Sequence, residues 1–89
     1  MVTSDEHIGM AVEDIDTPVL LCDLDALEHN IQMLSMHFAA AGKQLRPHTK
    51  SHKTPAIANM QMAAGAIGVT CAKLGEAEVM ADAGIQDIL

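Results

Sequence analysis

The chain has 89 residues, carries 12 acidic against 5 basic side chains, and has a formal net charge of −7. Phe38 is its only residue of the Phe, Tyr and Trp group, so aliphatic side chains and Met must fill any core. A chain of this length can build one modest core, which limits it to one domain or part of one. Nucleic-acid binding is not expected, because stacking rings are lacking and the net charge repels phosphates.

The N-terminal segment and the cysteines indicate the cytoplasm. Residues 1–7 are acidic and lack the apolar stretch of a signal peptide. Cys22 and Cys71 each lie in an apolar run, which favours two buried thiols over a disulfide. We therefore expect a cytoplasmic protein.

The uncharged stretch 54–72 approaches the length of a membrane span. It contains Pro55, Gly65 and Gly68 as well as polar residues, and its pattern changes midway. We therefore reject a transmembrane helix and expect no membrane partner.

The first half of the chain predicts a tail, a strand and a helix. Residues 1–14 form the tail, and the apolar segment 17–23 is typical of a buried strand. A helix should follow from Asp25, which has capping-box spacing to Glu28, and it should stop at Gly42. Its apolar face recurs at steps of four, three and four residues, at Leu27, Ile31, Leu34 and Phe38.

The second half of the chain alternates strands and helices at short intervals. Segment 43–53 contains a strand with a polar exit loop. Thr54 and Pro55 have the residue types of an N-cap and a first helical position, and their helix should run to about Ala64. The remaining predicted elements are a strand at 66–72, a helix at 74–83 and a strand that begins at 85–89.

This alternation predicts an α/β fold with parallel strands and right-handed crossovers. Residues 15–89 would form a partial domain, about the N-terminal third of a TIM (β/α)8 barrel, since a closed barrel needs about 250 residues. The sequence ends inside an apolar strand, so we expect a truncated barrel. The alternative is a compact standalone domain whose last strand pairs within a small sheet.

The positive charge lies in the middle of the chain. All five basic residues fall within 29–75, a span that has no carboxylate side chain. Four of them occur within eleven residues, namely Lys43, Arg46, Lys50 and Lys53. A local cationic site in an acidic chain suits a small anion in a pocket better than a long polyanion.

The segment 46–53 carries the most informative pattern. In a strand, Arg46, His48 and Lys50 project to one face, where the simplest interpretation is a polar surface. Lys50 also stands between a strand end and a helix start, where α/β folds bind ligands. The positive charges of Arg46 and Lys53 favour its neutral amine, which Schiff-base chemistry needs.

A zinc site built on His48 and His52 is not expected. Helical zinc motifs of this spacing need a glutamate directly after the first histidine, where this chain has Thr49. Pro47 and Pro55 also leave little room for such a helix.

Several segments resemble the N-terminal part of the D-threonine aldolase and D-serine dehydratase group, over residues 15–89. These are fold-type III enzymes that use pyridoxal 5′-phosphate (PLP) and are related in their barrel to alanine racemase. The specific part is the Arg-Pro-His-Thr-Lys-Ser-His-Lys run at 46–53. The other matching segments lie at 15–20, 23–28, 68–73 and 76–78.

The resemblance implies that Lys50 is the catalytic lysine and binds PLP as a Schiff base, with Lys53 as a neighbour. Arg46 and His48 are the further cofactor-binding candidates. The implied activity is that of a lyase on a small β-hydroxy-D-amino acid, by retro-aldol cleavage as in an aldolase. The alternatives are β-elimination, as in D-serine dehydratase, and a non-catalytic PLP-binding protein of the same barrel type.

The resemblance also implies features of a full-length enzyme. A divalent metal would be bound by residues near the C-terminus of that enzyme, so this chain is expected to contain no metal ligand. The full-length protein would be a homodimer, and the fragment alone would be inactive. A third class of function is a small anion-binding or interaction module without a cofactor.

Overall fold

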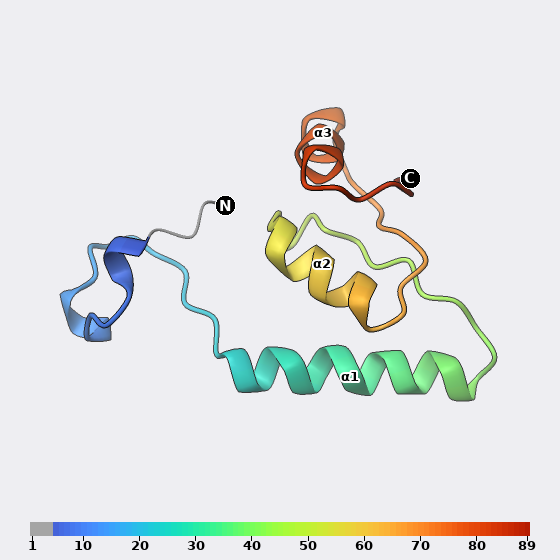
Figure 1. The fold of residues 1–89 in the computed structure, drawn as a ribbon, viewed down its shortest axis with the longest axis horizontal. Coiled ribbons are helices and arrows are strands. Elements are labelled where there is room, and N and C mark those ends of the chain that lie inside the picture. The colour runs from blue at the N-terminus through green and yellow to red at the C-terminus, as the bar shows by residue number, and fades with distance from the viewer. Residues whose placement is uncertain (1–4) are drawn as a thin grey trace.

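The structure, a computed structural model, describes residues 5–89 (Figure 1). Its elements are the 3₁₀ turns η1 (Asp5–His7) and η2 (Val12–Asp14) and the helices α1 (Leu24–Ala40), α2 (Pro55–Ala63) and α3 (Leu74–Asp82). The predicted second and third helices are confirmed to within one residue of their expected ends. None of the helices in this described part of the chain is long and apolar enough to cross a membrane. The first four residues of the predicted tail 1–14 lie outside the described residues.

Helix α1 begins two residues earlier than the capping-box pattern predicted. Oδ1 of Asp23 accepts a hydrogen bond from the backbone N of Ala26 at 3.0 Å, so Asp23 is the N-cap. Asp25 lies in the first turn, where its charge suits the helix dipole. The prediction of Asp25 as the cap was wrong because aspartate is a suitable N-cap residue at both positions, and only Asp23 keeps an extended backbone. The helix ends before Gly42, whose φ of 67° favours glycine, as predicted.

Three extended segments pair in parallel, at residues 45–49, 67–71 and 87–89. The backbone N of Thr70 donates to the O of Pro47, and the N of Thr49 donates to the O of Thr70, both at 2.8 Å. On the other side of the middle segment, Val69 pairs with the last segment in the same parallel sense. The parallel arrangement predicted for the strand regions in 43–53, 66–72 and 85–89 is therefore confirmed. Within the described residues, the pairing consists of isolated bridges rather than continuous strands.

One extra residue interrupts the pairing between the first and middle segments. The backbone N of Ile67 donates to the O of Leu45 at 3.0 Å. The next bridge along these segments pairs His48 with Thr70. Between this bridge and the Ile67–Leu45 hydrogen bond, Gly68 and Val69 lie opposite Pro47 alone. The extra residue makes a β-bulge. Because Pro47 has no N–H to donate, the bulge falls where a regular ladder would lack a hydrogen bond.

The helices cover one face of the paired segments and leave the other face open. The buried core consists of Ala58 of α2, Val69, Met80 of α3 and Ile85. Pro47 and Thr49 of the first segment are buried as well. Arg46 and His48, which alternate with them, are more exposed and lie on the open face, as the strand pattern predicted.

Residues 5–23 lie apart from this layer (Figure 1). Segment 17–23 was predicted to be a buried strand, but it forms no bridge within residues 5–89, and Leu20 is 94% exposed. Cys22 is exposed, contrary to prediction, whereas Cys71 packs against the core. Both predictions failed because an apolar composition shows that a segment favours burial, but it does not show which surface of the protein would bury it. The Cα radius of gyration of 14.5 Å accordingly exceeds the roughly 12 Å of a compact chain this long.

Gly68→Ala should destabilise the paired segments. A Cβ at position 68 would lie 2.3 Å from the backbone O of Asp87 and 2.5 Å from Nη1 of Arg46. Because the first contact is with backbone, the middle and last segments would have to move apart. We expect the free energy of unfolding of the full-length protein to fall by about 1–3 kcal/mol, measured by urea denaturation.

The matched control is Gly75→Ala in α3, where a Cβ meets nothing within 4 Å. This substitution should be neutral or slightly stabilising, because alanine is the better helix former. Equal losses of stability in the two variants would contradict the close approach at Gly68.

Candidate active site

Lys50 follows the first paired segment at its carboxyl end. The backbone O of Thr49 accepts hydrogen bonds from the N of His52 at 3.2 Å and from the N of Lys53 at 2.7 Å, which closes a turn around Lys50. Lys50 is exposed, and no ion pair within residues 5–89 involves it. The turn therefore presents an unpaired amine at the edge where the segments 67–71 and 87–89 also end, which is where parallel α/β folds bind ligands.

His48 lies two residues before Lys50 on the open face. Its Nδ1 accepts a hydrogen bond from the backbone N of Lys50 at 3.1 Å. A neutral imidazole that accepts at Nδ1 carries its proton on Nε2. His48 thus restrains the backbone of Lys50 and offers an N–H donor beside it.

The ammonium group of Lys53 forms an ion pair with Glu76 of helix α3. Its Nζ lies 3.5 Å from Oε1 of Glu76, and Oε2 of Glu76 accepts a hydrogen bond from the backbone N of Ala72 at 3.0 Å. The hydrogen bond from Ala72, followed by the charge of Lys53, holds the pKa of the Glu76 carboxyl below its usual value. Lys53 is therefore partly neutralised, whereas Lys50 is not.

Arg46 is paired with Asp87 of the last segment. Nη1 of Arg46 lies 2.8 Å from Oδ1 of Asp87, and the hydrogen bond and charge of Arg46 lower the pKa of that carboxyl. Two of the cations expected from the sequence to form a positively charged site, Arg46 and Lys53, are therefore paired with carboxylates. The sequence-based view was incomplete because the fold brings in carboxylates from outside the span 29–75, at Glu76 and Asp87.

His52 ends the turn in a half-buried position. Its Nδ1 accepts a hydrogen bond from the backbone N of Thr54 at 2.9 Å, and Oγ1 of Thr54 donates to the O of His52 at 2.7 Å. Nε2 of His52 and Oε1 of Gln61 are buried without a hydrogen-bond partner. Burial lowers the pKa of His52, and the nearby Gln61 side chain opposes this shift. Among residues 5–89, no group of three His, Cys, Asp or Glu side chains is placed to hold a metal ion.

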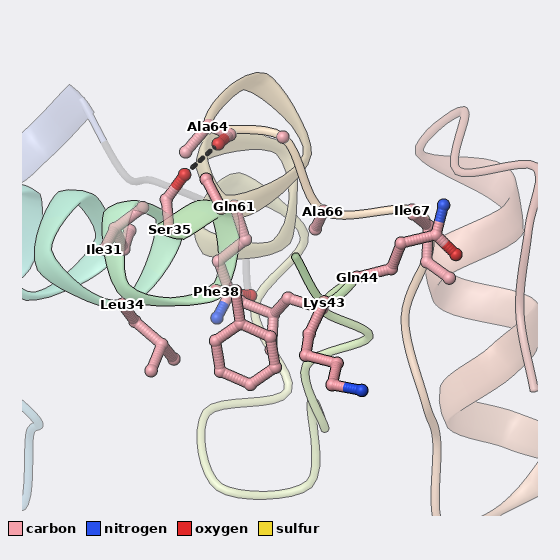
Figure 2. A pocket seen from close by; sticks show the side chains of 13 residues that line it. Ile31, Leu34, Ser35, Phe38, Lys43, Gln44, Gln61, Ala64, Ala66 and Ile67 are labelled. Carbon is pink, nitrogen blue, oxygen red and sulfur yellow. Dashed lines mark hydrogen bonds between the residues drawn. The ribbon is translucent and has the colours of Figure 1, made fainter. Parts of the chain in front are cut away.

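A cavity of about 280 Å³ lies elsewhere, between α1 and the chain that follows α2 (Figure 2). Ser35 on α1 donates a hydrogen bond to the O of Ala64 at this cavity, and Phe38 and Gln61 also line it. None of its lining residues belongs to segment 46–53. This cavity is therefore no part of the candidate site around Lys50.

Two carboxylates that pair with cations of the segment 46–53 were missed from the sequence. Glu76 lies three residues after Lys73, the N-cap of α3, and that spacing could have indicated a side chain that reaches back to the backbone. Asp87 carries no such local signal, because its partner Arg46 is set by the register of the paired segments. The three predicted site residues, Arg46, His48 and Lys50, do occur together at the first segment, and their roles stay predictions.

The chain is similar to several enzymes of known activity. A family described as the alanine racemase N-terminal domain matches residues 22–89. The 3-hydroxy-D-aspartate aldolase of Paracoccus denitrificans is 43% identical over 82 residues, which cover 91% of this chain and 21% of that protein. The D-threo-3-hydroxyaspartate dehydratase of Delftia sp. strain HT23 is 44% identical over 75 residues, covering 84% of this chain and 20% of that protein.

A solved structure is similar to this chain in fold as well as in sequence. The crystal structure of the D-threonine aldolase from Filomicrobium marinum matches with a TM-score of 0.82 and 55% identity, over 86% of this chain and 21% of that one. The chain has the fold of the matching part of that enzyme. It spans about a fifth of the length of the relatives that it matches.

The lowered pKa of His52 predicts a pH-dependent stability. The unfolded state binds a proton near pH 6.5, whereas the folded state resists it to lower pH. The unfolded state therefore binds more protons in this window, and stability is lost as the pH falls below about 6.5 towards the folded-state pKa. Urea denaturation of the full-length protein between pH 5 and 7.5 should show this loss.

The variant His52→Gln should flatten that pH profile, because glutamine does not titrate. His29→Gln on the exposed surface of α1 is the control and should keep the wild-type profile. A pH profile that is unchanged by His52→Gln would show that His52 does not cause the loss of stability.

Proposed function

Because this chain belongs to the alanine racemase N-terminal domain family, we propose that it is part of a PLP-dependent lyase that acts on a β-hydroxy-D-amino acid. The observation that carries the proposal is the unpaired amine of Lys50 at the carboxyl ends of the parallel segments. The aldolase and dehydratase relatives support this reaction class. The activity, substrate and partners are proposed for the full-length protein.

The residues around Lys50 suit the cofactor by their chemistry. An exposed primary amine without an ion-pair partner can bond to an aldehyde carbon, and Lys50 has that state among the described residues. Lys53 is the weaker candidate for the anchor, because Glu76 holds its ammonium group. His48 is a second candidate contact, since its Nε2 carries the proton when the imidazole is neutral.

When bound, PLP withdraws electrons from the bonds at the substrate Cα. The chain's own residues would then supply attachment and proton transfer. Lys50 Nζ would hold the cofactor in the resting enzyme and, once released, could accept or return a proton at the substrate. The hydrogen bond from the Lys50 backbone to His48 would restrain the turn and keep that amine near the substrate.

We propose retro-aldol cleavage as the reaction, in which the β-hydroxyl proton is removed, the Cα–Cβ bond breaks to release an aldehyde, and Cα takes up a proton to give glycine. Dehydration is the second candidate, because a matched relative is a D-threo-3-hydroxyaspartate dehydratase. In that reaction the α-proton and the β-hydroxyl leave as water, and a second water hydrolyses the resulting enamine to a 2-oxo acid and ammonia. A divalent metal, a homodimer and a cytoplasmic location are further proposals for the full-length enzyme.

Lys50 should be the residue that carries the cofactor. Borohydride reduction of the full-length protein with PLP, followed by peptide mapping, should place the label on Lys50. Lys50→Ala should abolish the absorbance of protein-bound PLP and turnover. Lys53→Ala is the matched control and should keep both, because its partner is Glu76. A label on Lys53 would contradict the assignment.

Product analysis should separate the candidate activities. D-threonine, D-serine and 3-hydroxy-D-aspartate should be assayed side by side with the PLP-loaded full-length protein. We expect glycine and the matching aldehyde from at least one of them, and no product from the L-isomers. A 2-oxo acid with ammonia as the only products would identify a dehydratase. Lys50-bound PLP without turnover of any of the three would favour the non-catalytic alternative.

A further inference from the structure

The guanidinium of Arg46 connects all three parallel segments. Its Nη1 donates to Oδ1 of Asp87 at 2.8 Å, to the backbone O of Asp87 at 3.3 Å and to the backbone O of Val69 at 3.4 Å. Arg46 lies on the first segment, Val69 on the middle one and Asp87 on the last one. The side chain of Arg46 therefore reaches from the first segment over the middle one to the last, and a single nitrogen contacts both.

The crossing is possible because of Gly68 in the bulge. A Cβ at this position would lie 2.5 Å from Nη1 of Arg46 and 2.9 Å from Cβ of Asp87. The absent side chain leaves the space in which the ion pair sits. The bulge, the glycine and the ion pair therefore form one arrangement, which fixes how the first and last segments are placed across the middle one.

The ion pair has little value as electrostatic attraction alone. The side chains of Arg46 and Asp87 are 25% and 60% exposed, and exposed ion pairs contribute about 0–1 kcal/mol to stability. Its significance is geometric, because the isolated bridges between the segments fix their register only weakly. A short directional contact across all three segments restrains that register.

Arg46 is also placed away from the amine of Lys50 along the chain. Four residues of extended backbone span roughly 13 Å. The donors of Nη1 are already engaged by the three acceptors on the neighbouring segments. The distance and the fixed Nη1 suit a residue that positions the segment, while the donors of Nε and Nη2 stay available to a ligand.

We propose that Arg46 and Asp87 act as a positioning pair, which sets the place of Lys50 by holding the register of the three segments across Gly68. This inference rests on the proposed function, because it assigns the lysine a reactive role. It differs from the sequence-based expectation that Arg46 contacts the cofactor. Misplacement of a reacting group by about 1 Å can cost about 100-fold in rate, so loss of the pair should affect kcat more than substrate binding.

A double-mutant cycle on the PLP-loaded full-length protein tests this pair. We expect Arg46→Met and Asp87→Asn each to lower kcat about tenfold or more, with KM changed less than about threefold. The double variant should be no worse than the poorer single one, because each change breaks the same contact. Arg46→Lys should restore part of kcat, since an ammonium group can still donate to Asp87.

The chain contains a matched control pair in Lys53 and Glu76, whose charged atoms are 3.5 Å apart and which does not cross the three segments. Lys53→Met and Glu76→Gln should leave kcat within about twofold of wild type. Additive losses in the Arg46–Asp87 cycle would overturn the proposal. A rise in KM or in the PLP dissociation constant with Arg46→Met, without the same rise for Asp87→Asn, would also overturn it, because Arg46 would then bind the ligand itself.

A readout without turnover separates this inference from the proposed function. Borohydride labelling of Lys50 should slow equally in Arg46→Met and Asp87→Asn, while the control variants label at the wild-type rate. If the wild type labels but turns over no substrate, the proposed reaction fails and the labelling rates still decide the inference. Unchanged labelling in both variants would overturn the positioning pair, and a wild type that takes up no label would overturn both proposals.

Discussion

The parallel pairing of the segments 45–49, 67–71 and 87–89 is the constraint on which the rest of this structure depends. Parallel strands end at a common edge, so residues far apart in sequence are placed side by side there. This pairing puts Lys50 at the edge and brings Asp87 within reach of Arg46. The helices cover one face of the paired segments, and the candidate site residues lie on the other face.

The sequence predicted the helices well because their signals are local. Pro55 at a helix start and glycine at the helix ends act within a few residues, and those boundaries were found to within one residue. The parallel order was also predictable, since short strand–helix alternation leaves few other topologies. The start of α1 was misplaced because Asp23 and Asp25 both suit a cap, and only the backbone conformation separates them.

The candidate site was predictable only in part, because its electrostatics depend on contacts between distant residues. The pattern of 46–53 indicated which side chains share a face, but not that Asp87 and Glu76 would oppose two of the cations. The bulge at Gly68 was equally hidden, since it arises from the offset between two segments and from the missing N–H of Pro47. Sequence patterns therefore indicated the candidate residues, and the fold determined which of them carry an unopposed charge.

The amount of buried surface sets how firmly this arrangement is held. The chain exposes 6613 Å², whereas a compact protein of 9.4 kDa exposes about 5,000 Å². Large apolar side chains such as Leu20 and Leu89 are exposed, and among residues 5–89 the buried hydrophobic cluster consists of Ala58, Val69, Met80 and Ile85. Such a small core gives limited hydrophobic stabilisation. Directional contacts such as the Arg46–Asp87 pair therefore have a larger share in fixing the register, and polypeptide that covered the open face would strengthen them by excluding water.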